Sequence, residues 1–142
     1  MIEHDIYDPV VETRPVTEQF SLDRAQYREQ VKYLFQHSDF YQRKFAEAGF
    51  TTPEQVGELD DIAALPFTEK DEIRQSQADF PPFGNHVAAS PDSLRRVFST
   101  SGTTGVPCYL GLTESDLDMY ATNVARGYTA ACLLYTSPSP RD

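Results

Sequence analysis

The apolar positions in the first third of the chain recur with the period of an α-helix. Tyr27, Val31 and Leu34 are spaced i, i+4 and i+7, which places them on one helical face. Ser21 is a good N-cap residue, so the pattern predicts a helix over residues 21–37. This face is suited to packing against a neighbouring element.

Short polar residues and a glycine delimit a second predicted helix. Ser38 and Asp39 interrupt the first helix and can cap the next one, while Gly49 suits the position just after its end. Its apolar surface would come from Phe40, Tyr41, Phe45 and Ala48. We interpret this aromatic content as packing between two helices.

Prolines punctuate the rest of the helical part. Pro9 and Pro15 predict irregular chain over residues 1–20, and Thr52-Pro53 predicts a short helical turn. Beyond it, three residues predict a further apolar face that ends near Pro66: Leu59, Ile62 and Leu65.

The second half changes from helical to strand-like patterning. A Thr-x-x-acid start at Thr68 predicts a helix of about two turns through Ile73. Residues 95–99 and 107–112 read as strands, and Thr113 opens a second Thr-x-x-acid start. The apolar face of this last helix would be Leu117, Tyr120, Val124 and Tyr128.

Composition limits the function classes. The 142 residues include 12 basic and 22 acidic ones, a net charge of −10, which disfavours nucleic-acid binding. No apolar run is long enough for a membrane span, and the acidic start is unlike a signal peptide, so we expect a cytoplasmic protein. The cysteines and histidines are Cys108, Cys132, His4, His37 and His86. They lack metal-ligand spacing, so the sequence predicts no metal-ligating residue.

Between the two predicted strands lies a run of seven Ser, Thr and Gly residues at 99–105, here called the Ser/Thr/Gly segment. Glycines let backbone N–H groups converge on an anion, and hydroxyls add donors. The run lacks the Lys of a Walker A motif and does not fit GxGxxG. It is therefore either a phosphate cradle or an ordinary turn. Arg95 and Arg96 precede it, and we interpret them as solvated surface charges.

At residues 98–107 the chain resembles the phosphate-binding signature of the adenylate-forming enzymes. Three further segments resemble the phenylacetate–CoA ligase family in particular, and they lie at residues 7–15, 38–49 and 65–71. The resemblance covers roughly residues 7–131. The four matching segments follow in order, which makes a chance match improbable.

The resemblance implies an α/β fold in which these helices and the strand–loop–strand–helix unit begin a large domain. It implies an ATP-dependent, AMP-forming ligase that activates an aryl or arylacetic acid as an acyl-adenylate and transfers it to CoA, with Mg²⁺ normally assisting. A homodimer would be compatible with it. Five residues would hold the phosphates. Ser101, Thr103 and Thr104 would do so through their hydroxyls, and Gly102 and Gly105 through the backbone.

Two departures qualify this interpretation. Val106 stands where family members often have Lys, which would weaken the grip on phosphate. The chain has no counterpart of the family's acyl, adenine and CoA sites or of its catalytic lysine. No catalytic residue is therefore predicted. Residues 1–131 are expected to be an inactive part of an N-terminal domain. Residues 132–142 resemble a translated library adapter and are expected to be non-native.

Two other classes of protein stay open from the residues alone. One is a small, non-catalytic helical interaction protein, because the surface is acidic and the helices carry aromatic residues. The other is a stand-alone nucleotide-binding module without chemistry. ATP binding would separate the first of these from the ligase and from the binding module.

Overall fold

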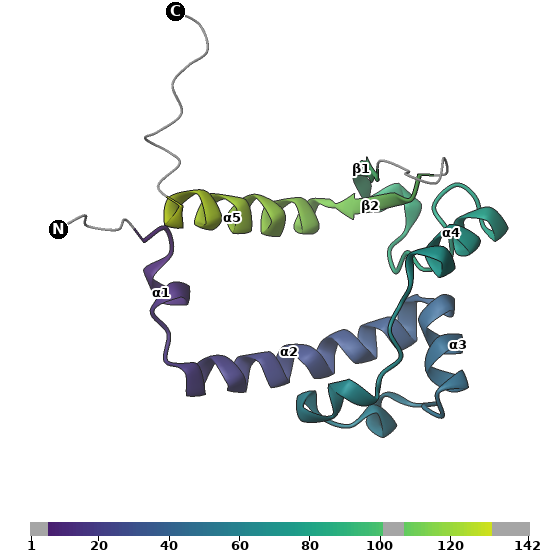
Figure 1. Ribbon diagram of the computed structural model, residues 1–142, viewed down its shortest axis with the longest axis horizontal. Helices are drawn as coiled ribbons and strands as arrows, with labels where there is room; N and C mark the ends of the chain where they lie inside the picture. The colour runs from purple at the N-terminus through teal and green to yellow at the C-terminus, as the bar shows by residue number, and fades with distance from the viewer. Residues whose placement is uncertain (1–5, 101–106, 132–142) are drawn as a thin grey trace, which may run out of the picture.

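The computed structural model describes residues 6–100 and 107–131. Helices come first and are followed by two strands and a last helix, as the sequence predicts. Figure 1 shows α2 and α5 along opposite sides, with α1 at one end and α3 and α4 at the other. The elements are α1 (Pro9–Glu12), α2 (Val16–His37), α3 (Asp39–Glu47), η1 (Pro53–Val56), η2 (Leu59–Ala64), α4 (Lys70–Asp79), η3 (Pro91–Ser93), β1 (Leu94–Ser99), β2 (Tyr109–Thr113) and α5 (Glu114–Ala130), where η marks a 3₁₀ helix.

The prediction of irregular chain before residue 20 was wrong. Pro9 is the first residue of α1, and Pro15 is the N-cap of α2. Proline is tolerated at these positions because the first N–H groups of a helix have no intrahelical acceptor. Ser21 is therefore not a cap: it lies inside α2, where its hydroxyl donates to the Thr17 carbonyl at 3.1 Å. The predicted end of this helix at His37 is confirmed, and Val31 of its predicted apolar face is buried.

The second helix begins and ends where the sequence predicts. The Ser38 hydroxyl accepts from the Tyr41 N–H at 3.4 Å, and Gly49 takes a φ of 93° directly after the end of α3. This conformation lets the Phe50 N–H donate back to the Phe45 carbonyl at 2.8 Å. Phe45 is 4% exposed and packs against Phe35 of α2, with 5.3 Å between ring centroids.

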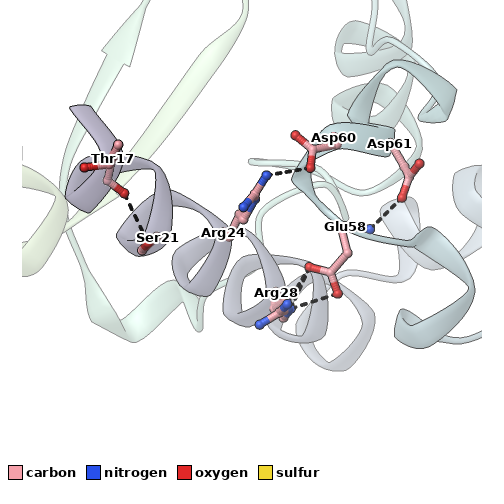
Figure 2. A network of polar contacts seen from close by, with 7 residues as sticks. All are labelled: Thr17, Ser21, Arg24, Arg28, Glu58, Asp60 and Asp61. Carbon is pink, nitrogen blue, oxygen red and sulfur yellow. Dashed lines mark hydrogen bonds and ion pairs between the residues drawn. The ribbon is translucent and has the colours of Figure 1, made fainter.

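Two ion pairs attach η2 and its N-cap to α2. The Arg28 guanidinium lies 2.6 Å from the Glu58 carboxylate, and Arg24 lies 2.8 Å from Asp60 (Figure 2). The predicted short turn at Pro53 is confirmed as η1, and Val56 from it is 2% exposed. The sequence predicts Ile62 on a buried apolar face, but its side chain is 51% exposed.

Helix α4 is longer than the sequence predicts and begins at a different cap. Glu69 is the N-cap, and its N–H donates to the Glu72 carboxylate at 2.7 Å. Two contacts lower the pKa of Glu72 below its usual value. The larger cause is that bond, and the next is the contact with Lys44 of α3. No glycine or proline follows before residue 81, so the helix continues past Ile73 to Asp79.

The strand–strand–helix unit forms as predicted. β1 and β2 pair as an antiparallel two-stranded sheet, with Ser99 opposite Tyr109. Thr113 caps α5: its N–H and hydroxyl both donate to the Asp116 carboxylate at 2.8 Å. On the predicted apolar face of α5, Tyr120 contacts Phe98 of β1 but remains 54% exposed.

Few apolar side chains of the described residues are buried. They are Val31, Phe45, Val56 and Cys108. The first three lie where α2, α3 and η1 meet, and the fourth lies between α4 and the start of β2. None of the helices in the described ranges has the length and apolar character that crossing a membrane requires.

Candidate functional site

The predicted phosphate-binding residues lie outside the described residues. They are Ser101, Gly102, Thr103, Thr104 and Gly105. The structure describes the chain on each side of them, up to Thr100 and from Pro107 onward. The geometry of the candidate site is therefore that of the two ends of the β1–β2 hairpin and of the elements that hold them.

Hydrogen bonds join the two ends of the hairpin. The Thr100 N–H donates to the Cys108 carbonyl at 2.9 Å, and the Cys108 N–H donates to the Thr100 hydroxyl at 3.1 Å. This pair continues the ladder one step beyond the register of Ser99 and Tyr109. The structure thus brings the chain on the two sides of the candidate phosphate-binding residues 101–105 together.

Helix α4 holds the second of these flanks. The Gln77 side chain donates to the Tyr109 carbonyl at 2.7 Å and accepts from the Tyr109 N–H at 3.3 Å. The Cys108 thiol is 2% exposed and lies 3.9 Å from the carbonyl of Lys70, the first residue of α4. Its neighbours include no second cysteine among the described residues, which agrees with a buried structural thiol.

The cations near the hairpin are placed as the sequence predicts for surface charges. Arg95 and Arg96 are exposed, and the Arg95 guanidinium donates to the Asp92 carbonyl at 3.3 Å. Lys70 is exposed at the start of α4. Within residues 6–100 and 107–131, no three His, Cys, Asp or Glu side chains gather where they could hold a metal ion.

A buried polar cluster next to α4 was not predicted. The Ser76 hydroxyl donates to the Asn85 side-chain carbonyl at 2.8 Å, accepts from the Asn85 N–H at 3.0 Å and lies 3.0 Å from His86 Nδ1. Burial lowers the pKa of His86 below its usual value. Ser76 is only 5% exposed, so this serine–histidine contact secures a turn and offers no accessible nucleophile.

Gly84 is the one local signal of this cluster in the sequence. Its φ is 85°, and a Cβ there would lie 2.6 Å from the Ser76 hydroxyl. Glycine is thus required both by the backbone conformation and by the close approach of Ser76. The Gln77–Tyr109 contact left no signal, because it joins residues 32 positions apart.

An open groove of about 580 Å³ lies between α2 and the hairpin. One wall comes from Gln30 and Tyr33 of α2, and the Tyr33 hydroxyl donates to the Ala88 carbonyl at 2.6 Å. Leu110 of β2 and Asp116 of α5 line the opposite side. The groove has both apolar and polar walls and borders the strand that follows the candidate phosphate-binding residues.

The chain matches curated phenylacetate–CoA ligases along most of its length. It is 36% identical to that of Thermus thermophilus over 126 residues, covering 89% of this chain and 27% of the relative. It is 33% identical to that of Escherichia coli over 142 residues, covering 100% of this chain and 30% of the relative. The chain is a relative of the phenylacetate–CoA ligases. It spans less than a third of the length of these two relatives.

Solved structures agree with this kinship in fold. An open conformation of 2-hydroxyisobutyryl-CoA ligase, in complex with 2-HIB-AMP and CoA, superposes with a TM-score of 0.77 at 32% identity. The match covers 89% of this chain and 29% of that one. The fold is that of an N-terminal part of an adenylate-forming ligase, as predicted from the sequence. No family model matches the chain.

Proposed function

We propose that this chain is the N-terminal part of an ATP-dependent, AMP-forming CoA ligase. The observation that carries the proposal is the kinship with four phenylacetate–CoA ligases at 33–36% identity. Residues 1–131 would begin the large domain, and residues 132–142, which lie outside the described residues, would be a non-native tail. The substrate would be an aryl or arylacetic acid resembling phenylacetate.

The reaction would proceed in two steps. The substrate carboxylate attacks the α-phosphate of ATP, which forms an acyl-adenylate and releases pyrophosphate. The CoA thiol then attacks the acyl carbon, loses its proton and displaces AMP, which yields the thioester. The residues that would bind acid, adenine and CoA are not among those identified in this chain, so we propose that the 142-residue chain alone does not turn over.

The role of this chain would be to hold the phosphates during the first step. Ser101, Thr103 and Thr104 would donate hydroxyl hydrogen bonds, and Gly102 and Gly105 would let backbone N–H groups approach the phosphate oxygens. Fixed donors stabilise the charge that builds up on the leaving pyrophosphate. Mg²⁺ would arrive with ATP and neutralise part of that charge.

The described geometry supports this role on the two sides of residues 101–105. Thr100 and Cys108 are bonded to each other, and Gln77 holds Tyr109. Both flanks are therefore anchored, so donors placed between them would pay less conformational entropy on binding an anion. The small-molecule partners would be the carboxylic acid, ATP and CoA.

Calorimetric titration of Mg·ATP into the 142-residue chain tests the proposal. Replacing Thr103 and Thr104 together by valine keeps their shape and removes both hydroxyls. We expect this double variant to bind about tenfold or more weakly, because a hydrogen bond to a charged group contributes about 1.5 to 3 kcal/mol. Thr122→Val, on the exposed side of α5, is the control and should bind normally.

Two results would contradict the proposal. One is the absence of ATP binding by the unsubstituted chain, and the other is unchanged binding by the Thr103/Thr104 double variant. The inactivity of the chain is tested separately by a coupled pyrophosphate-release assay with phenylacetate, ATP and CoA. Turnover in that assay would show that this part suffices for chemistry.

A further inference from the structure

The open edge of β2 is bonded to a side chain in place of a strand. In an antiparallel pair, successive residues direct their N–H and C=O groups alternately toward and away from the partner strand. Cys108 directs both groups to Thr100. Tyr109 therefore directs both groups to the opposite edge, and it is there that the Gln77 side chain meets them.

The glutamine side chain is chemically suited to this position. Its amide carries one acceptor oxygen and N–H donors, the same groups as a peptide unit. It pairs with both backbone groups of Tyr109, at 2.7 Å and 3.3 Å, as a neighbouring strand would. Unpaired strand edges are open to water and to other chains. This pairing therefore fixes one position along an edge of β2 on which no third strand lies in the described two-stranded sheet.

We propose that Gln77 is a positioning residue that fixes the start of β2 on helix α4, and with it the second flank of the candidate phosphate-binding residues. This inference rests on the proposed function, because positioning matters for ligand binding only if phosphates bind there. Gln77 contacts no proposed ligand. It acts through Tyr109 and through the adjoining Cys108, which is itself buried against the first turn of α4.

The chain offers a matched control in the same helix. Gln75 lies two residues earlier in α4, is exposed, and donates to Asp79 at 2.8 Å within the helix. Gln75→Ala and Gln77→Ala thus remove the same side chain from the same element. They differ in whether the hairpin loses a contact.

Amide hydrogen exchange of the 142-residue chain tests the structural half of the inference. We expect Gln77→Ala to accelerate exchange at the Tyr109 amide by about tenfold or more, and at Thr100 to a lesser degree, because the edge becomes open to water. Gln75→Ala should leave both amides unchanged. Equal exchange at Tyr109 in the two variants would overturn the inference.

Gln77→Glu adds a readout that a loss of general stability would not produce. An ionised carboxylate can still accept from the Tyr109 N–H, but it cannot donate to the carbonyl. A protonated carboxyl can do both. A glutamate carboxyl ordinarily titrates near about pH 4.3, and bonding to the carbonyl favours the protonated form. Protection at Tyr109, relative to the unsubstituted chain, should therefore rise as the pH is lowered from about 7 to about 4. A pH-independent ratio would overturn the inference.

Binding of Mg·pyrophosphate to the same variants tests the functional half. We expect Gln77→Ala to bind several-fold more weakly and Gln75→Ala to bind normally. For Gln77→Glu, we expect the affinity relative to that of the unsubstituted chain to recover at low pH. Faster exchange at Tyr109 with undiminished binding would overturn the positioning role and leave the proposed function standing. No binding by the unsubstituted chain would contradict the proposed function, and the positioning role with it.

Discussion

The junction of α2, α3 and η1 buries its apolar side chains further than the hairpin with α5 does, although α2 also exposes Val16 and Phe20 nearer its start. Where α2, α3 and η1 meet, Val31, Phe45 and Val56 are 5%, 4% and 2% exposed. In the hairpin and α5, Leu110 is 47% and Tyr120 54% exposed. The junction of α2, α3 and η1, here called the first region, therefore finds its packing partners among the described residues. The hairpin with α5, here called the second region, leaves much of its apolar surface open to water.

Stability and the candidate function lie in different parts of this chain. Burial of apolar surface is the main favourable term in folding, so the first region should supply most of the stability. The second region carries the candidate phosphate-binding residues between its strands. Helix α4 connects the two, through Lys44 and Glu72 on one side and Gln77 and Tyr109 on the other.

The largest expected effect contrasts two phenylalanines. Phe45→Ala removes a 4% exposed side chain from the first region and should lower the free energy of unfolding by about 3 to 5 kcal/mol. Phe98→Ala, in β1, removes a 37% exposed side chain and should cost about 1 kcal/mol or less. Urea unfolding followed by circular dichroism measures both. Equal losses would break the comparison, and Phe67→Ala, 91% exposed, is the control.

A smaller effect is expected from the polar cluster beside α4. Ser76→Ala removes the acceptor of the Asn85 N–H from a site where water cannot replace it, because Ser76 is 5% exposed. The expected loss is about 1 to 3 kcal/mol in the same unfolding experiment. Ser21→Ala, an exposed position within α2, should be close to neutral. Similar losses at the two serines would show that the cluster contributes little.

The same cluster should make stability depend on pH. Burial lowers the pKa of His86 in the folded chain, so the unfolded chain binds its proton more readily. Stability should therefore be complete above about pH 6.5, the ordinary histidine value, and fall as the pH drops through it. His86→Asn should lose less between pH 7.5 and 5.5, as measured by urea midpoints. His37→Asn should keep the full dependence, and an identical slope in both variants would contradict this origin.

The smallest effect is expected from the ion pairs of Figure 2. Arg28 and Glu58 lie 2.6 Å apart, but their side chains are 54% and 49% exposed. Solvent screening and side-chain entropy leave such pairs a contribution below about 1 kcal/mol. Arg28→Ala should thus shift the urea midpoint only slightly, and less still in 1 M salt. A loss comparable to that of Phe45→Ala would mean that charges rather than apolar packing hold the first region together.

Sequence reasoning succeeded where the determinants of structure are local. Ser38 and Gly49 delimit α3, and Thr113 starts α5, because caps act on residues within one turn. It was wrong where one residue type has two uses. Pro15 was interpreted as a breaker but is the N-cap of α2, and the sequence alone did not decide between these roles.

The surroundings of the candidate site could be predicted far less well. Gln77 meets Tyr109 across 32 residues, and Ser76 meets Asn85 and His86 across a turn. Such contacts follow from how helices and strands pack. Gly84 is a local sign of the second, and the first has none in the sequence. The strands flanking the Ser/Thr/Gly segment were predicted correctly, whereas its assignment to phosphate came from resemblance and stays a prediction.

Titration of Mg·pyrophosphate into the ¹⁵N-labelled 142-residue chain, followed by amide chemical shifts, tests the central claim most directly. We expect shifts at Thr100, Cys108 and Tyr109, with the amides around Val31 and Phe45 unaffected. That result would place anion binding at the hairpin and leave the first region as its support. No shift at saturating pyrophosphate, or shifts spread equally over both regions, would contradict it.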